Sequence, residues 1–533
     1  MPRVKIDNRE VDVPAGATIL EAARLAGIEI PTLCFLKGLE PGTSCMVCLV
    51  KVVGRPALQP ACATRVEEGM AVQSEAPEVQ EARKAALELL LSDHLGDCEA
   101  PCRSACPAHM NIPLMIRQIR AGALADAAAT VKKDICLPSV LGRICPAPCE
   151  KVCRRHAKDS PLAVCLLKRF VGDADLASAH PYLPACKPAS GKKVAIIGAG
   201  PAGLAAAYHL LEAGHACTVF DDHDLPGGAL RYAVPEARLP RAVVDAEIDL
   251  IRRLGAEFRM GVRVGRDVSL DDLRRDFGAV AVAVGPIEDD TGRLGLPPAR
   301  SAAPGAGAKG IEADHATHRT AVEGVFAAGD AIYPHRVAVR ALAAGKGMAA
   351  SIDQYLTGRP VTGPHRPFTV HIGHLREGEL DLFMEGVSPA PRQAPPVDPA
   401  APACLPSLDA AAAVAEAERC LHCDCRKSDH CRLRDWSQAI HAHAGRFRGE
   451  RRTFQQQTSH PRILFEVGKC IDCGLCIQVA RKWKEPLGLT FIGRGFDVRV
   501  AVPFGRPLAD ALQKAAEECA AACPTGAIAL RDA

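Results

Sequence analysis

Cysteine residues are the groups in this sequence with the clearest capacity for chemistry, and the first four stand close to its start. Their spacing is C-x10-C-x2-C-x13-C. Four thiolates can hold a [2Fe–2S] cluster, and a C-x2-C pair in a tight loop directs two sulfurs at one site. Four cysteines also make a tetrahedral zinc site, but the hairpin and helix patterns that precede them favour iron and sulfur. The predicted ligands are Cys34, Cys45, Cys48 and Cys62.

A second group of eight thiols lies between residues 98 and 165, and eight is the number that two [4Fe–4S] clusters require. His94 stands four residues before the first of them. A neutral imidazole can replace a thiolate as a cluster ligand, so the sequence leaves open which of His94, Cys136 and Cys165 complete the two clusters. The eight cysteines are Cys98, Cys102, Cys106, Cys136, Cys145, Cys149, Cys153 and Cys165.

A third group of cysteines falls within the short segment "CLHCDCRKSDHC", at the end of an alanine-rich helical pattern. Thiols this close together are expected to share one metal. Zinc and a [4Fe–4S] cluster both suit four cysteines, and the other cysteine groups of the chain favour iron. The predicted ligands are Cys420, Cys423, Cys425 and Cys431.

The fourth group begins with "CIDCGLC", which matches the start of the bacterial ferredoxin pattern C-x2-C-x2-C-x3-C-P. Ala480 stands where that pattern has its fourth cysteine. In two-cluster ferredoxins this fourth cysteine serves the other cluster, so its absence removes a second cluster and spares the first. The first cluster then takes its last ligand from the distant Cys-Pro pair in "CPTGA". We predict one [4Fe–4S] cluster held by Cys470, Cys473, Cys476 and Cys523.

A glycine-rich turn in "VAIIGAGPAGLAAAYHLLEAGHACTVFD" predicts a dinucleotide site. Gly198 permits a tight turn after a strand, Gly200 allows the backbone to approach a pyrophosphate, and Gly203 lets the following helix pack on the strand. Asp221 ends the second strand, where an acid can bind a ribose hydroxyl pair. The strand, the helix and the acid together make this signal specific.

A later segment, "GVFAAGDAI", decides between FAD and NAD. It resembles the second FAD motif of flavoproteins with two dinucleotide folds, in which the aspartate contacts the ribityl–phosphate part of FAD. This resemblance assigns Gly329 and Asp330 to the cofactor and favours FAD. Gly228, in "PGGALRYAVPEARLP", belongs to the same resemblance.

Hydrophobic periodicity indicates the elements that must position these groups. Residues 3–13 alternate about a polar turn, as in a β-hairpin, and Thr18 with Glu21 makes a helix capping box. Helical patterns fill residues 79–190, and a strand–helix–strand pattern follows. The predicted fold class is multidomain: an α+β [2Fe–2S] ferredoxin domain, an α-helical domain with two [4Fe–4S] clusters, an α/β Rossmann-like FAD domain and a C-terminal ferredoxin-like [4Fe–4S] region.

The predicted boundaries follow these changes of pattern. We expect the ferredoxin-like domain at 1–78, the helical domain at 79–190 and the FAD domain at 191–360. A Pro-rich linker is expected at 361–409, and a C-terminal domain with two [4Fe–4S] clusters at 410–533.

Several families share these motifs. The FAD segments resemble the glutamate synthase small subunit. Three pieces of residues 112–170, "IPLMIRQIRAG", "LGRICPAPCEKVCRR" and "SPLAVCLLKRF", resemble the glutamate synthase small subunit and the N-terminal part of dihydropyrimidine dehydrogenase. That resemblance implies that Cys153 joins the cluster of the first cysteine segment, and that Cys106 joins Cys145 and Cys149. The N-terminal spacing resembles complex I large subunits, iron-only hydrogenases and NAD-linked formate dehydrogenases. The C-terminal "KCIDCGLCIQVA" resembles iron–sulfur segments of complex I and formate dehydrogenase subunits.

One part of the resembled flavoproteins is missing. They insert a second Rossmann unit, which binds the pyridine nucleotide, between the strand ending in "AVG" and the "GVFAAGD" strand. Such a domain needs about 100 residues, whereas only residues 286–323 are available here, without a strand–glycine-loop–helix pattern. "GAGAKG" (305–310) is therefore predicted to be a flexible loop.

Composition limits the partners. The net charge is +3 and no apolar stretch is long enough to cross a membrane, so neither nucleic acid nor a membrane is expected. The start of the chain lacks the pattern of a signal peptide, and dense cysteine spacings in a reducing compartment indicate metal. We expect a cytoplasmic protein.

The chemistry predicted from these motifs is redox, and no catalytic triad or carboxylate pair stands out. We predict an oxidoreductase subunit with one FAD, one [2Fe–2S] cluster and about four [4Fe–4S] clusters. It would relay electrons to a redox partner, such as a formate dehydrogenase-like or hydrogenase-like enzyme, a ferredoxin or an NAD(H)-binding subunit. The alternative is a stand-alone NAD(P)H-dependent oxidoreductase that resembles the glutamate synthase small subunit.

Overall fold

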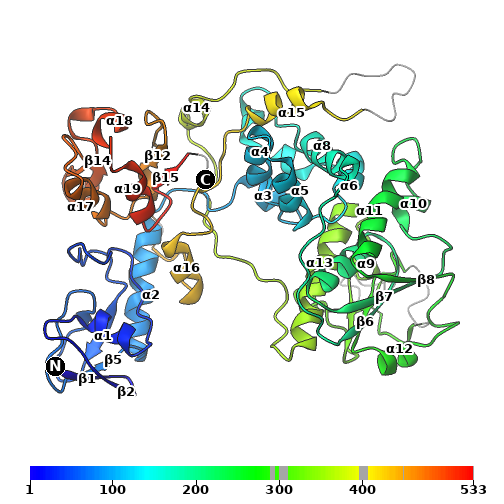
Figure 1. The fold of residues 1–533 in the computed structure, drawn as a ribbon, viewed down its shortest axis with the longest axis horizontal. Coiled ribbons are helices and arrows are strands. Elements are labelled where there is room, and N and C mark those ends of the chain that lie inside the picture. The colour runs from blue at the N-terminus through cyan, green and yellow to red at the C-terminus, as the bar shows by residue number, and fades with distance from the viewer. Residues whose placement is uncertain (288–293, 299–309, 395–405, 448, 532–533) are drawn as a thin grey trace. The chain divides into compact units, whose positions relative to one another are not determined.

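The computed structural model describes residues 1–287, 294–298, 310–394, 406–447 and 449–531 (Figure 1). The chain forms two compact units, and each is described by itself. Unit 1 consists of Met1–Ala100, Pro367–Gly386 and Cys423–Ala533. Unit 2 consists of Pro101–Arg366 and Val387–His422. Unit 1 is therefore discontinuous in sequence, and all of unit 2 lies between its first and last segments.

The N-terminal part of unit 1 is a five-stranded sheet with one helix. Its elements are β1 (Arg3–Ile6), β2 (Arg9–Asp12), α1 (Ile19–Leu25), β3 (Leu49–Val52), β4 (Gln59–Pro60) and β5 (Ala71–Gln73). The sheet order is β2-β1-β5-β3-β4, and β1 with β2 forms the predicted antiparallel hairpin. The predicted capping box is confirmed, because the Thr18 hydroxyl accepts from Glu21 N and the Glu21 carboxylate accepts from Thr18 N. Apolar side chains of the sheet and of α1 share one core.

The remainder of unit 1 combines short helices with two small sheets, β11-β12-β15 and β13-β14. Its elements are α2 (Pro77–Ser92), α14 (Glu379–Met384), α16 (Arg432–Ala439), β11 (Gln456–Gln457), β12 (Ile463–Glu466), α17 (Leu475–Lys482), β13 (Thr490–Ile492), β14 (Arg499–Ala501), α18 (Leu508–Ala511), α19 (Ala516–Ala522) and β15 (Ile528–Leu530). Helices α17 and α19 pack on each other. Their apolar faces and strand β12 enclose a core of their own.

Unit 2 begins with a group of helices that includes one from after residue 387. These helices are α3 (Pro101–Ala105), α4 (Ile112–Arg120), α5 (Leu124–Lys132), α6 (Pro138–Ile144), α7 (Pro148–Lys151), α8 (Val164–Ala177) and α15 (Ala410–Ala417). Helices α6 and α8 approach closely because each offers a glycine to the other. A Cβ on Gly142 would lie 2.4 Å from Arg169 Cβ, and one on Gly172 would lie 2.7 Å from Ser139 N.

The second part of unit 2 is a parallel sheet with order β10-β9-β6-β7-β8 and helices around it. Its elements are β6 (Lys193–Ile197), α9 (Pro201–Glu212), β7 (Ala216–Asp221), α10 (Ala229–Tyr232), α11 (Arg241–Arg253), β8 (Glu257–Met260), α12 (Leu270–Asp276), β9 (Ala279–Val282), β10 (Val325–Ala327) and α13 (Ala338–Leu356). Side chains of β6 alternate between two cores, as in a sheet covered on both faces. Val194 and Ile196 pack in the core shared with α9 and α13, and Ala195 and Ile197 pack in the core shared with α12.

Strands β9 and β10 are direct neighbours in this sheet, although 42 residues separate them in sequence. Val325 pairs with Val280 and Ala327 with Val282. Among the described residues between these strands, the structure contains turns and isolated bridges such as Pro298–Ile311. Residues 305–309, most of the segment predicted to be a flexible loop, lie outside the described residues.

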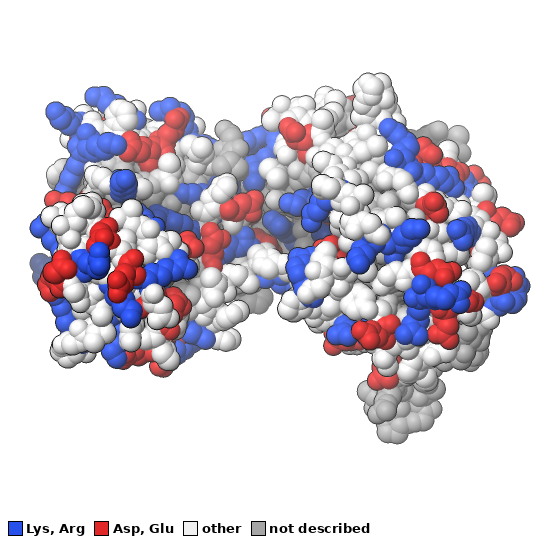
Figure 2. Space-filling view, turned by 60° about the horizontal axis from the view of Figure 1, so that its bottom comes forward, with Lys and Arg blue, Asp and Glu red and all other residues white. Residues whose placement is uncertain are grey.

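The described helices include none that is long and apolar enough to cross a membrane. On the face shown in Figure 2, basic and acidic side chains are interspersed, in keeping with the net charge of +3.

Candidate metal centres and dinucleotide site

Cys34, Cys45, Cys48 and Cys62 are buried together beside the N-terminal sheet. Cys34 Sγ lies 3.3 Å from Cys45 Sγ, and Cys48 Sγ lies 3.4 Å from Cys62 Sγ. The hydrogen bond from Cys45 lowers the pKa of Cys34 to about 5, and the bond from Cys62 lowers the pKa of Cys48 to about 7. The same bonds raise the pKa of Cys45 and of Cys62. One thiol of each pair is thus readily ionised, as a metal site requires.

The loop before β3 positions two of these thiols. Met46 takes a positive φ of 53° between Cys45 and Cys48, and its side chain is exposed while both sulfurs are buried. This left-handed turn lets the C-x2-C segment present both thiols to the interior.

Cys470, Cys473, Cys476 and Cys523 line one small cavity in unit 1. Gly474, with φ of 72°, precedes α17 and turns the chain between the second and third thiol. Burial raises the pKa of Cys473 to about 12 and holds the pKa of Cys476 well above its ordinary value. Burial therefore disfavours the thiolate forms of Cys473 and Cys476.

A third set of thiols surrounds a buried lysine in unit 2. Lys168 Nζ lies 4.0 Å from Cys165 Sγ. Burial alone would lower the pKa of Lys168, but the thiolates of Cys165, Cys145, Cys106 and Cys149 outweigh burial and raise it. Cys165 is within hydrogen-bonding range of Cys145 and Cys149. The structure thus brings Cys165, one of the residues left open by the sequence, into the set.

Cys136, another residue left open, occupies a different environment. It lies in the apolar core with Tyr208 and Glu247 among its neighbours. Burial raises its pKa, and the Glu247 carboxylate adds to this effect. Burial also raises the pKa of Glu247 to about 8, although its carboxylate accepts from the backbone N–H groups of Ser139 and Val140.

Three further thiols belong to unit 2, on α3, after α7 and after α15. Cys102, Cys153 and Cys420 all pack, partly buried, against the same core, and α3 contacts α7. Arg155 Nη1 donates to Arg419 O at 2.6 Å, which ties the segment after Cys153 to the one before Cys420.

The thiols predicted to share a metal at residues 420–431 are divided between the units. Cys420 belongs to unit 2, whereas Cys423, Cys425 and Cys431 belong to unit 1. Within unit 1, Cys425 N donates to Cys98 O at 3.4 Å. The thiols of Cys98, Cys425 and Cys431 lie close enough for their charges to interact.

His94 belongs to unit 1 and follows α2. Its side chain is partly exposed, but its Nδ1 atom is buried and has no hydrogen-bond partner among the described residues. Burial lowers the pKa of His94 to about 4, and the ammonium group of Lys469 adds to this effect. The imidazole is therefore neutral near pH 7, the form that binds metals.

A cavity of about 790 Å³ in unit 2 lies at the carboxyl ends of β6, β7 and β9. The predicted glycines shape its wall. A Cβ on Gly198 would lie 2.3 Å from Ala283 O, and one on Gly203 would lie 1.9 Å from Gly198 O. A Cβ on Gly228 would lie 2.7 Å from Gly200 Cα, so these two backbones touch. A Cβ on Gly200 itself would point into open space, with Gly228 Cα 3.9 Å away.

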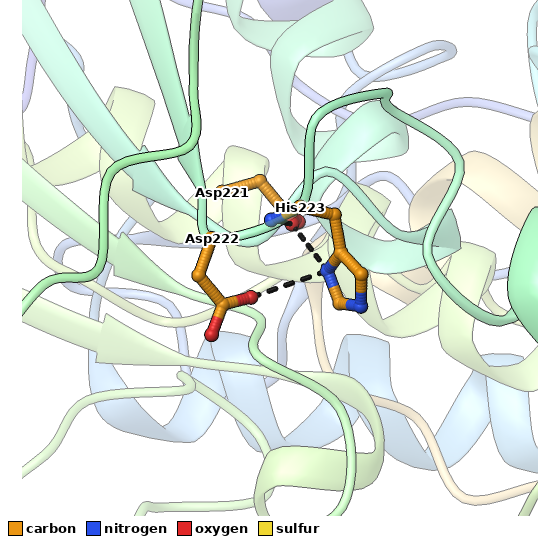
Figure 3. A group of neighbouring side chains, drawn as sticks. All are labelled: Asp221, Asp222 and His223. Atoms are coloured by element: carbon orange, nitrogen blue, oxygen red, sulfur yellow. Dashed lines mark hydrogen bonds and ion pairs between the residues drawn. The ribbon is translucent and has the colours of Figure 1, made fainter.

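Asp221 ends β7 and lines this cavity, and Figure 3 shows it beside Asp222 and His223. Its Oδ2 accepts from Ala199 N at 2.6 Å, so the carboxylate fixes the glycine-rich turn. His223 Nδ1 lies 2.8 Å from Asp221 Oδ1 and 3.1 Å from Asp222 Oδ1. The His223 ring stacks on Tyr232 with 4.3 Å between ring centroids. Sequence reasoning missed Asp222 and His223, which no motif marks, and it assigned no role to Tyr232, which stands in the segment "PGGALRYAVPEARLP".

Gly329 and Asp330 also reach the cavity. Gly329, with φ of 72°, starts a turn of 3₁₀ helix after β10. Asp330 lines the cavity and accepts from His335 N at 3.1 Å and Arg336 N at 3.2 Å. Arg238 and Arg336 add positive charge to the lining. Arg238 stands in the segment "PGGALRYAVPEARLP", but sequence reasoning assigned neither arginine to the site.

Three family models match consecutive segments of the chain. A 2Fe–2S iron–sulfur cluster binding domain matches residues 2–77. Domain II of dihydropyrimidine dehydrogenase, with a 4Fe–4S cluster, matches residues 77–180. An NAD(P)-binding Rossmann-like domain matches residues 196–255. The predicted multidomain fold class, with ferredoxin, [4Fe–4S] and Rossmann-like domains, is confirmed.

Curated relatives match over part of their length. The chain is 42% identical over 207 residues to the NADP(+)-dependent formate dehydrogenase subunit beta of Moorella thermoacetica, covering 35% of this chain and 29% of that protein. It is 40% identical over 190 residues to the NADPH-Fe(3+) oxidoreductase subunit beta of Geobacter sulfurreducens, covering 35% and 28%. It is 39% identical over 192 residues to the glutamate synthase [NADPH] small chain of Mycobacterium tuberculosis, covering 36% and 39%. The predicted resemblance to the glutamate synthase and formate dehydrogenase families is confirmed, over less than half of each relative.

Among solved structures, the NAD+-reducing [NiFe]-hydrogenase in its H2-reduced state overlaps with a TM-score of 0.35 and 12% identity, covering 99% of this chain and 87% of that chain. This overlap is too loose to support an inference.

Proposed function

We propose that this chain is an iron–sulfur flavoprotein subunit of a multisubunit oxidoreductase, which relays electrons between FAD in unit 2, its iron–sulfur clusters and a redox partner. The partner is a dehydrogenase of the formate or hydrogenase type, a ferredoxin or an NAD(H)-binding subunit. The observation that carries the proposal is the presence of several buried thiol sets in the same chain as a dinucleotide cavity. We further propose that the chain acts in the cytoplasm.

The cavity suits FAD. The contact between Gly200 and Gly228 leaves bare backbone at the cavity wall, which a pyrophosphate can approach. Arg238 and Arg336 supply positive charge, and Asp330, in the segment that resembles the second FAD motif, reaches the same cavity. A site for NAD alone would not need this second segment.

Once bound, FAD can exchange electrons singly or in pairs, which lets it connect two-electron donors with one-electron clusters. The protein's own residues hold and orient it. Asp221 fixes the glycine-rich turn through Ala199 N, and Asp330 orders the chain before α13 through two backbone N–H groups. Apolar residues such as Val234 and Val264 limit water in the cavity.

The thiol sets suit iron–sulfur clusters. We propose a [2Fe–2S] cluster at Cys34, Cys45, Cys48 and Cys62, and a [4Fe–4S] cluster at Cys470, Cys473, Cys476 and Cys523. A further [4Fe–4S] cluster is proposed at Cys106, Cys145, Cys149 and Cys165. Cys102, Cys153 and Cys420 are proposed as three ligands of another cluster in unit 2, and Cys136 is not proposed as a ligand.

An anaerobic titration of the purified chain tests the relay. We expect dithionite to reduce both flavin and clusters, and NADH or NADPH to bleach the flavin slowly without a partner protein. Addition of a partner dehydrogenase with its substrate should then reduce the flavin rapidly. Rapid bleaching by NADH or NADPH alone contradicts the relay.

That contrary result supports the second candidate, a stand-alone NAD(P)H-dependent oxidoreductase. The names of the relatives favour this candidate, because several of them are NADPH-linked. Against it stands the length of chain between β9 and β10, because 42 residues are too few for a pyridine-nucleotide domain of about 100 residues.

A further inference from the structure

We propose that His94, Cys98, Cys425 and Cys431 hold one [4Fe–4S] cluster, whose ligands come from two segments that residues 99–424 separate in the sequence. The proposal rests on the iron–sulfur function proposed above and names a ligand set that the spacing of the cysteines did not indicate. All four residues belong to unit 1.

The backbone brings the two segments together. Cys425 N donates to Cys98 O at 3.4 Å. Arg434, on α16, connects both sides, because its Nη1 donates to Ser428 O at 2.9 Å and its Nη2 to Glu99 Oε1 at 3.1 Å. Ser428 lies between Cys425 and Cys431, and Glu99 adjoins Cys98. The three thiols are all buried, with exposed fractions between 6% and 8%.

His94 supplies the fourth ligand. It stands four residues before Cys98, and its buried Nδ1 lacks a hydrogen-bond partner among the described residues. A buried nitrogen without a partner is unfavourable, and a bond to iron removes that cost.

Lys469 is the common neighbour of this set. Its side chain is 2% exposed, forms an ion pair with Glu466, and interacts electrostatically with His94, Cys98 and Cys425. Gly96, between His94 and Cys98, leaves room for it, because a Cβ there would lie 2.4 Å from Lys469 Cε. Three proposed ligands therefore converge on one buried ammonium group.

The position of the set suits a step in electron transfer. A Cβ on Gly526 would lie 2.1 Å from Cys425 Sγ, so Cys425 presses against the loop that follows Cys523. Lys427 Nζ donates to Cys523 O at 2.7 Å. Cys431 shares an apolar cluster with Cys34 and Cys45. The proposed centre thus adjoins both other centres of unit 1, so electrons can pass among the three.

Serine variants of the anaerobically purified full-length chain test the grouping by electron paramagnetic resonance. We expect Cys98→Ser and Cys431→Ser to remove the same cluster signal. Cys420→Ser, the matched control from the neighbouring thiols, should leave that signal and alter a different one. Loss of one common signal in Cys420→Ser and Cys431→Ser overturns the proposal.

The histidine is tested in the unmodified chain as well as in a variant, so the outcome does not depend on folding of the variant. With ¹⁵N-labelled histidine, we expect one reduced cluster to show hyperfine coupling to a histidine nitrogen. His94→Cys should keep the cluster but lose this coupling, and its reduction equilibrium should fall at least tenfold because a thiolate adds negative charge. His430→Ala, at an exposed residue beside Cys431, should change neither the histidine hyperfine coupling nor the reduction equilibrium of the cluster.

Failure of this inference differs from failure of the proposed function. A chain with full iron content but no histidine coupling overturns the His94 ligand alone. A chain that binds no iron overturns the function and the inference together.

Discussion

The N-terminal [2Fe–2S] site and the proposed His94 centre differ in how the chain gathers four ligands. Cys34 and Cys62, the outermost thiols of the first site, belong to loops of one small sheet. The His94 centre draws Cys98 and Cys425 from two segments that are separated in the sequence by all of unit 2. The first site is recognisable from the spacing of its cysteines in the sequence. The second is recognised only in the structure, from the common neighbour Lys469 and from the buried Nδ1 of His94 without a hydrogen-bond partner among the described residues.

The largest expected effect is a difference in iron content between variants of two cysteines whose role as cluster ligands the sequence left undecided. Cys165→Ser should remove one [4Fe–4S] signal and about four irons per chain, because Cys165 lies among the thiols around Lys168. Cys136→Ser should keep full iron content, since Cys136 lies beside Glu247 in the core. Iron analysis and paramagnetic resonance of both variants make the comparison. Equal loss of iron in the two variants would mean that proximity to the thiols around Lys168 does not predict which cysteines bind the cluster.

Gly200→Ala should sharpen the contrast between metal and flavin sites. The new methyl group meets no protein atom closer than 3.9 Å, so the fold tolerates it, but the methyl group faces the cavity where a pyrophosphate would approach. We expect bound flavin to fall at least tenfold while iron content stays constant. Unchanged flavin occupancy would show that the dinucleotide does not bind along this turn.

The two buried lysines allow a matched comparison between the units. Lys168→Met and Lys469→Met each remove a cation beside one thiol set, and a nearby positive charge stabilises the reduced, more negative cluster. Each variant should lower the midpoint potential of a single cluster by about 59 mV, a tenfold change for one electron. Redox titration would contradict this account if both variants shifted the same cluster.

The smallest effect concerns the pocket around Cys136. Burial raises the pKa of Glu247 to about 8, above the ordinary value of about 4.3. Between these values the unfolded chain releases a proton that the folded chain keeps, so the free energy of unfolding falls as pH rises through this window. We expect Glu247→Gln to be less stable than the wild type at pH 5, because one backbone N–H loses its acceptor. Its free energy of unfolding should, however, fall less than that of the wild type between pH 5 and pH 8. Identical pH slopes in thermal unfolding would argue against a protonated Glu247.

Much of the fold could be predicted because its signals are local. The hairpin at residues 3–12, the capping box at Thr18 and the glycine-rich turn at Gly198 are each set by a few neighbouring residues, and the structure has all three. The [2Fe–2S] and [4Fe–4S] domains were likewise predicted from cysteine spacing within short segments.

The grouping of distant ligands could not be predicted in this way. Cys425 stands two residues from Cys423 in sequence, yet the structure pairs its backbone with Cys98. Lys168 and Lys469 stand in the cysteine segments that the sequence analysis quotes, but the sequence does not show which thiols folding brings around each of them. His223 carries no motif either, although its contacts with Asp221 and Tyr232 are local in the sequence.

The most direct test of the central claim is metal and flavin analysis of the anaerobically purified chain. One [2Fe–2S] and four [4Fe–4S] clusters correspond to about 18 irons per chain, and the cavity to one FAD. We predict values near these, with little zinc. Zinc in place of iron at the thiol sets, or absence of flavin, would contradict the account.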